Sequence, residues 1–140
     1  MSSTPNLSEP KENLKIRVLL VDNDTIFLDV ASDYLRRQQE LIVVGVISRG
    51  AELLEQIQEL KPQVILIGVN KYGLETICQL RETSPGVRVV ALSLLNNNAY
   101  LQAALAAGAD DLIHKAKLTT DLLPAIQQVM QSNRSWNCPR

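Results

Sequence analysis

The residues of this chain that could do chemistry follow its apolar runs, at the points where strands are expected to end. Asp22, Asn23 and Asp24 come directly after the first apolar run. Ser93 follows the fourth run, and Lys115 follows the fifth. Carboxylates bind a hard divalent cation, whereas hydroxyl and ammonium groups bind phosphate oxygens. If the fold brings these five residues together, they indicate a site for a cation and a phosphate.

An alternation of strand-like and helix-like segments positions these residues. Five short, nearly continuous apolar runs predict strands that are covered on both faces, at 16–21, 41–46, 64–69, 87–92 and 111–114. Between and after these runs, apolar residues recur at helical spacing. Parallel strands need crossover helices, and right-handed crossovers place those helices on both faces of the sheet. The pattern therefore predicts an α/β doubly wound sandwich, in which ligands bind beyond the carboxyl ends of the strands.

Two details of the helices follow from the same periodicity. In the first helix, Ile26 and Val30 belong to the apolar stripe that we expect to face the sheet. In the last helix, Thr119 or Thr120 is expected to act as the N-cap. That start would place Pro124 near the first turn, where its missing N–H matters least.

Length and composition indicate one ordinary globular domain. The chain has 140 residues, 46% of them hydrophobic, and a formal net charge of -1, which gives no reason to expect a nucleic-acid partner. No apolar run is long enough to span a membrane, and the N-terminus has no signal-peptide core, so we expect a cytoplasmic protein. We expect a disordered tail at 1–14, one domain at 15–132, and a tail or linker stub at 133–140.

Three segments together resemble a known family. VDND at the end of the first strand, Ser93 after the fourth and GADDLIHK around the fifth resemble the receiver domain of bacterial two-component response regulators. Receivers attached to helix-turn-helix output domains are the most similar class, and the resemblance covers about 16–131. It implies a flavodoxin-like (βα)5 fold whose five parallel strands have the order 2-1-3-4-5.

The resemblance also implies roles for individual residues. Members of the family accept a phosphoryl group on an aspartate that ends the third strand. Two acids after the first strand bind magnesium, and a hydroxyl and a lysine contact the phosphoryl group. By position, Asp22 matches the first acid, Ser93 the switch hydroxyl and Lys115 the lysine. Asn23 stands where the second acid is usual, and Gly68 stands at the acceptor position. Glycine supplies no nucleophile, so no acyl phosphate can form there.

Further departures from the family surround the acceptor position. The loop between Gly68 and Gly73 is shorter than usual, Leu94 replaces a small residue, and Leu112 replaces the aromatic residue of the activation switch. We expect Leu94 and Leu112 to pack toward the vacated site and to lock the domain in one state.

No metal or other cofactor is expected. An amide oxygen, such as that of Asn23, attracts a strongly hydrated magnesium ion less than a carboxylate does. Asp22 and Asp24 are the candidates for a residual magnesium site.

These observations lead to one main functional hypothesis and two alternatives. The main one is a pseudo-receiver, not an enzyme, that signals through a protein partner or as a homodimer. The family's contact face corresponds to the fourth helix, fifth strand and fifth helix, roughly 100–107 and 111–130. The first alternative is the receiver part of a transcription regulator whose DNA-binding domain is absent. The second is a phosphorelay member that uses Asp22 or Asp24 as acceptor.

Overall fold

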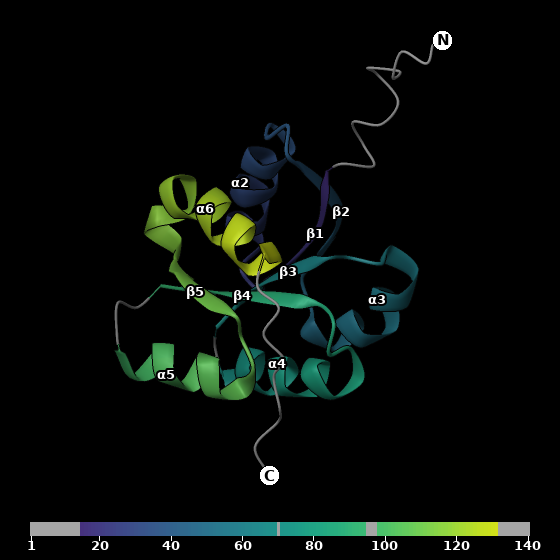
Figure 1. Cartoon of the computed structure of the whole chain (residues 1–140), viewed down its shortest axis with the longest axis vertical. Helices are drawn as coiled ribbons and strands as arrows, with labels where there is room; N and C mark the ends of the chain where they lie inside the picture. The colour runs from purple at the N-terminus through teal and green to yellow at the C-terminus, as the bar shows by residue number, and fades with distance from the viewer. Residues whose placement is uncertain (1–14, 70, 95–97, 132–140) are drawn as a thin grey trace.

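Five parallel strands form one sheet in the order β2-β1-β3-β4-β5 (Figure 1). The strands are β1 (Ile16–Val21), β2 (Leu41–Ile47), β3 (Val64–Gly68), β4 (Arg88–Ser93) and β5 (Asp111–His114). The computed structural model describes residues 15–69, 71–94 and 98–131, so the predicted tails at 1–14 and 133–140 lie outside the described residues. The order confirms the predicted flavodoxin-like sandwich.

Five helices cover the two faces of the sheet in the described part of the chain. They are α2 (Thr25–Arg36), α3 (Leu53–Leu60), α4 (Lys71–Thr83), α5 (Asn98–Ala107) and α6 (Leu118–Gln131). Two short 3-10 turns, η1 (Gly50–Glu52) and η2 (Lys115–Lys117), precede α3 and α6. One apolar cluster joins the sheet to α2 and α6, and a second joins it to α3, α4 and α5 (Figure 1). Within the described residues, no helix is long and apolar enough to cross a membrane.

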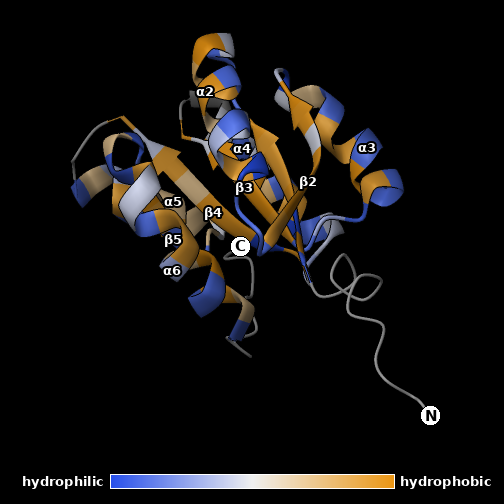
Figure 2. Ribbon diagram, turned by 90° about the horizontal axis from the view of Figure 1, so that it is seen from above, coloured by the Kyte–Doolittle hydropathy of each residue, from blue (hydrophilic) through white to orange (hydrophobic). Residues whose placement is uncertain are grey.

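The central strands supply side chains to both apolar clusters. In β3, Val64 and Leu66 face α2 and α6, whereas Ile65 and Ile67 face the other three helices. This division follows from the alternation of side chains along a strand. Figure 2 shows the result as a hydrophobic sheet whose covering helices carry hydrophilic residues on their outer sides. The apolar runs of the central strands β1, β3 and β4 are therefore buried on both faces, as predicted, whereas the edge strands β2 and β5 are mostly half-buried.

The strand boundaries differ slightly from the predicted ones. β3 ends at Gly68, one residue early, and β2 continues to Ile47. β4 begins at Arg88 and includes Ser93, which the sequence analysis placed after the strand. The backbone of Ser93 is therefore held by the sheet, where it pairs with His114.

The prediction for the outer residues of α2 was wrong. Ile26 is 75% exposed and Val30 is 65% exposed, whereas Leu28, Ala31 and Leu35 are buried. Each of the two exposed residues lies two positions from Leu28, which is about 200° around a helix. The spacing of Leu28, Ala31 and Leu35 defines the face that meets the sheet, and Ile26 and Val30 point away from it.

The predicted start of the last helix was also wrong. α6 begins at Leu118, because the turn η2 leads directly into it, so neither Thr119 nor Thr120 is the cap. Pro124 consequently lies inside the helix rather than in its first turn. Its ring lacks the N–H that would donate to the carbonyl of Thr120.

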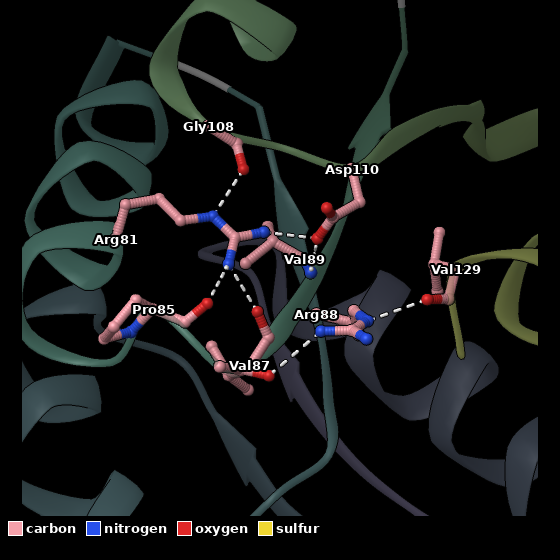
Figure 3. Close-up of polar contacts among 9 residues, drawn as sticks. Arg81, Pro85, Val87, Arg88, Val89, Gly108, Asp110 and Val129 are labelled. Atoms are coloured by element: carbon pink, nitrogen blue, oxygen red, sulfur yellow. Dashed lines mark hydrogen bonds and ion pairs between the residues drawn. The ribbon is translucent and has the colours of Figure 1, made fainter. Parts of the chain in front are cut away.

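A buried arginine joins three elements at the end of the sheet where β4 and β5 begin, here called the amino edge (Figure 3). The Arg81 side chain extends from α4 and is 2% exposed. Its Nε donates to the Gly108 carbonyl at 2.6 Å, and its Nη1 donates to the Val87 carbonyl. Its Nη2 forms an ion pair with Asp110. The second partner of the Asp110 carboxylate is the N–H of Val89, at 2.8 Å. Both charged side chains therefore make hydrogen bonds to the backbone in addition to their ion pair.

Candidate functional site

The opposite end of the sheet, here called the carboxyl edge, brings Asp22 and Lys115 into direct contact. Asp22 follows β1 and Lys115 follows β5, with the ends of β3 and β4 between them in the sheet. Lys115 Nζ lies 2.6 Å from Asp22 Oδ2, and the two side chains are 9% and 1% exposed. The sequence predicted that both residues lie at this edge, but not that they form an ion pair.

Backbone groups at the start of α2 and at the end of β2 hold Asp22 in place. Asp22 Oδ1 accepts the N–H of Asp24 at 2.9 Å, and the Asp22 N–H donates to the Ile47 carbonyl at 3.1 Å. Asp22 Oδ2 receives no further hydrogen bond within the described residues. The ammonium of Lys115 is therefore what compensates the charge of this buried oxygen.

An aromatic ring from α2 covers the lysine. Lys115 Nζ lies 4.3 Å from the centroid of the Phe27 ring. A cation at this distance from a ring face is attracted by the ring's quadrupole. The sequence placed Phe27 only in the apolar stripe of α2, and no local pattern relates Phe27 to a lysine at the far end of the chain. The ammonium thus lies against a carboxylate and a ring.

The Asp22 carboxylate fills the space that a side chain at Gly68 would need. A Cβ at Gly68 would lie 2.3 Å from Asp22 Oδ2 and 2.8 Å from Asp22 Cγ. Real Cβ atoms do not approach other atoms so closely, so any side chain at this position requires Asp22 to move. Gly68 itself is buried at the end of β3. The glycine and the ion pair are therefore sterically linked.

The remaining polar candidates lie at the same edge in different surroundings. Ser93 ends β4 and is 2% exposed. Asn23 is exposed. Asp24 is the N-cap of α2, and its Oδ1 accepts the N–H groups of Ile26 at 3.1 Å and Phe27 at 3.2 Å. The structure thus gives Asp24 a local structural task that the sequence analysis did not assign.

The prediction that Leu94 packs toward the site was wrong. Leu94 is 68% exposed, whereas Leu112 is half-buried and packs against the apolar cluster under α3, α4 and α5. The physical reason is that the Asp22 carboxylate occupies the space directly over Gly68. Leu94, which follows β4, therefore remains exposed at the surface.

A hollow of about 540 Å³ adjoins the ion pair on the side of α3 and α4. The ends of β1 and β3, the turn after β2 and the first half of α4 line it. The sequence contains no motif that predicts this hollow, since its walls come from four segments far apart in the chain.

Comparison with known proteins identifies the family. The model of the response regulator receiver domain matches residues 18–127. A protein-glutamate methylesterase/protein-glutamine glutaminase from Methanospirillum hungatei is 32% identical in an alignment of 107 residues that covers 73% of this chain and 31% of that protein. The protein of the same name from Bacillus subtilis is 39% identical over 49 residues, or 35% of this chain and 14% of that one. The chain thus spans less than a third of these curated relatives.

Solved structures agree with this assignment. The response regulator domain of Thermotoga maritima CheB has a TM-score of 0.77 and 29% identity, covering 86% of this chain and 99% of that one. The receiver domain of the putative response regulator NarL from Mycobacterium tuberculosis has a TM-score of 0.74 and 26% identity, covering 81% and 94%. With its sheet order and the match over residues 18–127, this chain belongs to the family of response regulator receiver domains.

Proposed function

We propose that this chain is a receiver domain that takes part in signal transduction through protein contacts, without phosphorylation at the end of its third strand. The observation that supports this most directly is the position of the Asp22 carboxylate over Gly68. Gly68 has no nucleophile, and the space where one would stand is filled. Lys115, the residue that the resemblance assigns to phosphoryl binding, is paired with Asp22 instead.

The donor groups at this edge do not fit a magnesium ion. Magnesium prefers several oxygen ligands and one or two carboxylates. Asp22 has the ammonium of Lys115 at 2.6 Å, and Asp24 caps α2. In the part of the chain that the structure describes, no three His, Cys, Asp or Glu side chains are grouped so that they could hold a metal ion. We therefore assign no step of the function to a metal.

The same contacts argue against Asp22 or Asp24 as a substitute phosphoacceptor. The side chain of Asp22 is 1% exposed, so a phosphodonor cannot reach its oxygens without the ion pair opening. Phosphorylation of Asp24 would disturb the cap of α2 through the oxygen that accepts two backbone N–H groups.

The contact face that we propose contains α5, β5 and α6. Of the residues of α5, only Ala104 is buried, although the helix is mostly apolar. Tyr100, Leu101 and Leu105 are half-buried at its surface. Apolar side chains that the domain itself leaves partly uncovered are typical of a surface that meets another protein.

Intact-mass measurement after incubation with acetyl phosphate and magnesium tests the absence of phosphorylation. We expect no added phosphoryl mass, and a receiver domain that has the acceptor aspartate serves as the positive control. An added phosphoryl mass that disappears in Asp22→Ala or Asp24→Ala would contradict the proposal and revive the phosphorelay function.

Light scattering after size-exclusion chromatography tests the contact face. We expect a homodimer, or a complex with a partner recovered by pull-down, and either should be lost in Leu105→Glu. Gln102→Glu is the matched control, because Gln102 is an exposed residue of the same helix. A monomer that captures no partner would contradict an interaction function.

A further inference from the structure

The hollow beside the ion pair has the position and size of a ligand site. It includes the ends of β1 and β3. Strand order reverses between these two strands, and open α/β sheets bind ligands at such a point. Its volume of about 540 Å³ lies within the range of pockets that hold small molecules.

The floor of the hollow is apolar. Val21 and Ile67 contribute the ends of two buried strands, and Leu54 contributes a half-buried side chain from α3. Gly68 and Gly73 also line the hollow and have no side chains that could fill it. An apolar group of a ligand could therefore replace water on this floor favourably.

Two unlike charges stand at the walls of the hollow. Arg49 comes from the turn after β2, and Glu75 comes from α4. Neither side chain has an ion pair among the described residues, and both are exposed. The carboxylate of Asp22, which also lines the hollow, is already neutralised by Lys115. Among the described residues that line the hollow, Arg49 and Glu75 thus remain as the charges that a ligand can use.

The walls that carry these charges face each other closely. A Cβ at Gly50 would lie 3.1 Å from Thr76 Oγ1, so the turn η1 and the helix α4 meet at these two residues. Arg49 and Glu75 are the immediate sequence neighbours of that pair. If they pair with each other in solution, the exposed ion pair is weak and a ligand can open it.

We propose that this hollow binds a small zwitterion, an α-amino acid with an apolar side chain. The ligand carboxylate pairs with the guanidinium of Arg49, which suits two parallel hydrogen bonds. The ligand ammonium pairs with Glu75, and the side chain lies on the apolar floor. This inference goes beyond the proposed function, because a bound amino acid would make a receiver domain respond to a metabolite rather than to a phosphoryl group.

Backbone NMR titration of the full chain with L-leucine tests the proposal against two analogues of leucine. The first analogue, 4-methylpentanoate, lacks the ammonium, and the second, 3-methylbutylamine, lacks the carboxylate. We expect leucine to shift the amide signals of Gly68 and Gly73 saturably at millimolar concentration. Each analogue should bind about tenfold more weakly or worse, because it loses one of the two ion pairs. Equal binding of all three compounds, or no shift with any of them, would overturn the proposal.

Substitutions locate the binding contacts. Arg49→Gln and Glu75→Gln should each weaken leucine binding by about tenfold, whereas Arg36→Gln, an exposed arginine at the end of α2, should leave it unchanged. Unchanged leucine binding in Arg49→Gln would overturn the assignment. A shift of the Gly68 and Gly73 amide signals by inorganic phosphate would also overturn it, because the hollow would then be a phosphate site. The intact-mass result does not depend on this titration, so failure of one proposal is distinguishable from failure of the other.

Discussion

Two buried ion pairs among the described residues stand at opposite edges of the sheet and differ in how fully their charges are hydrogen-bonded. At the amino edge, Arg81 donates to backbone carbonyls as well as to Asp110, and Asp110 accepts a backbone N–H (Figure 3). At the carboxyl edge, Asp22 Oδ2 has only the ammonium of Lys115 within the described residues. The first pair joins elements of the fold, whereas the second lies where receiver domains are expected to do their chemistry.

This difference has an energetic meaning. Burying a charge costs free energy unless its hydrogen-bonding groups are also satisfied. The ion pair of Arg81 and Asp110 meets that condition through its bonds to the backbone, so we interpret it as a contact that stabilises the fold. The Asp22 and Lys115 pair meets the condition only in part, and the ring of Phe27 supplies a weaker contact. A position at the phosphoryl site that the resemblance implies would account for a buried ion pair whose hydrogen bonds are incomplete.

The largest effect is expected from Arg81→Met. This change removes the guanidinium from Asp110 and from the carbonyls of Gly108 and Val87. Breaking a buried ion pair on one side destabilises a protein by about 3 to 5 kcal/mol. Urea unfolding measures the loss. Arg37→Met is the control, because its pair with Asp33 is exposed and should change stability by less than about 1 kcal/mol. A loss below about 1 kcal/mol in Arg81→Met would show that the network does not stabilise the fold.

A smaller loss is expected from Lys115→Met. The methionine keeps much of the apolar stem but leaves the Asp22 carboxylate buried and uncompensated. We expect a loss near the lower end of the range of about 3 to 5 kcal/mol for a broken buried ion pair, because Arg81 also donates to backbone carbonyls and Lys115 has Asp22 as its charged partner. The double variant Asp22→Asn with Lys115→Met should recover part of that loss, because the buried negative charge is then removed as well. If Lys115→Met costs as much as Arg81→Met in urea unfolding, hydrogen-bond satisfaction does not distinguish the two edges.

Gly68→Ala tests the steric link between the glycine and the ion pair. Its Cβ would overlap Asp22 Oδ2 at 2.3 Å, so we expect a loss of about 1 to 3 kcal/mol, as for other overpacked sites. The cost should fall when Asp22→Ala is introduced first. Gly86→Ala is the control, because a Cβ at that position meets nothing within 4 Å. An equal cost of Gly68→Ala with and without Asp22 would show that the carboxylate is not what excludes a side chain.

The sequence was sufficient to predict the strands of the sheet, but not the ion pair between Asp22 and Lys115 at its carboxyl edge. The strand boundaries came within about one residue, because continuous apolar runs record burial on both faces. Ile26 and Val30 were placed wrongly because a helix stripe read from apolar residues alone is wider than the face that meets the sheet. The sequence put Asp22, Gly68 and Lys115 at one edge through the strand order, whereas their contacts depend on side-chain reach across β3 and β4, which no local pattern encodes.

The smallest effect is expected from Phe27→Leu, which asks whether the ring contributes to the carboxyl-edge pair. Leucine keeps an apolar side chain over Lys115 but removes the ring face that lies 4.3 Å from its ammonium. A cation–π contact contributes about 0.5 to 2 kcal/mol, depending on how far it is removed from water. Part of the measured loss will come from the smaller volume of leucine, and a double-mutant cycle separates the two contributions. In the Lys115→Met background, the cation is absent and only the volume effect remains. We therefore expect Phe27→Leu to cost about 1 kcal/mol less in that background, and an equal cost in both would show that Phe27 acts as an ordinary core residue.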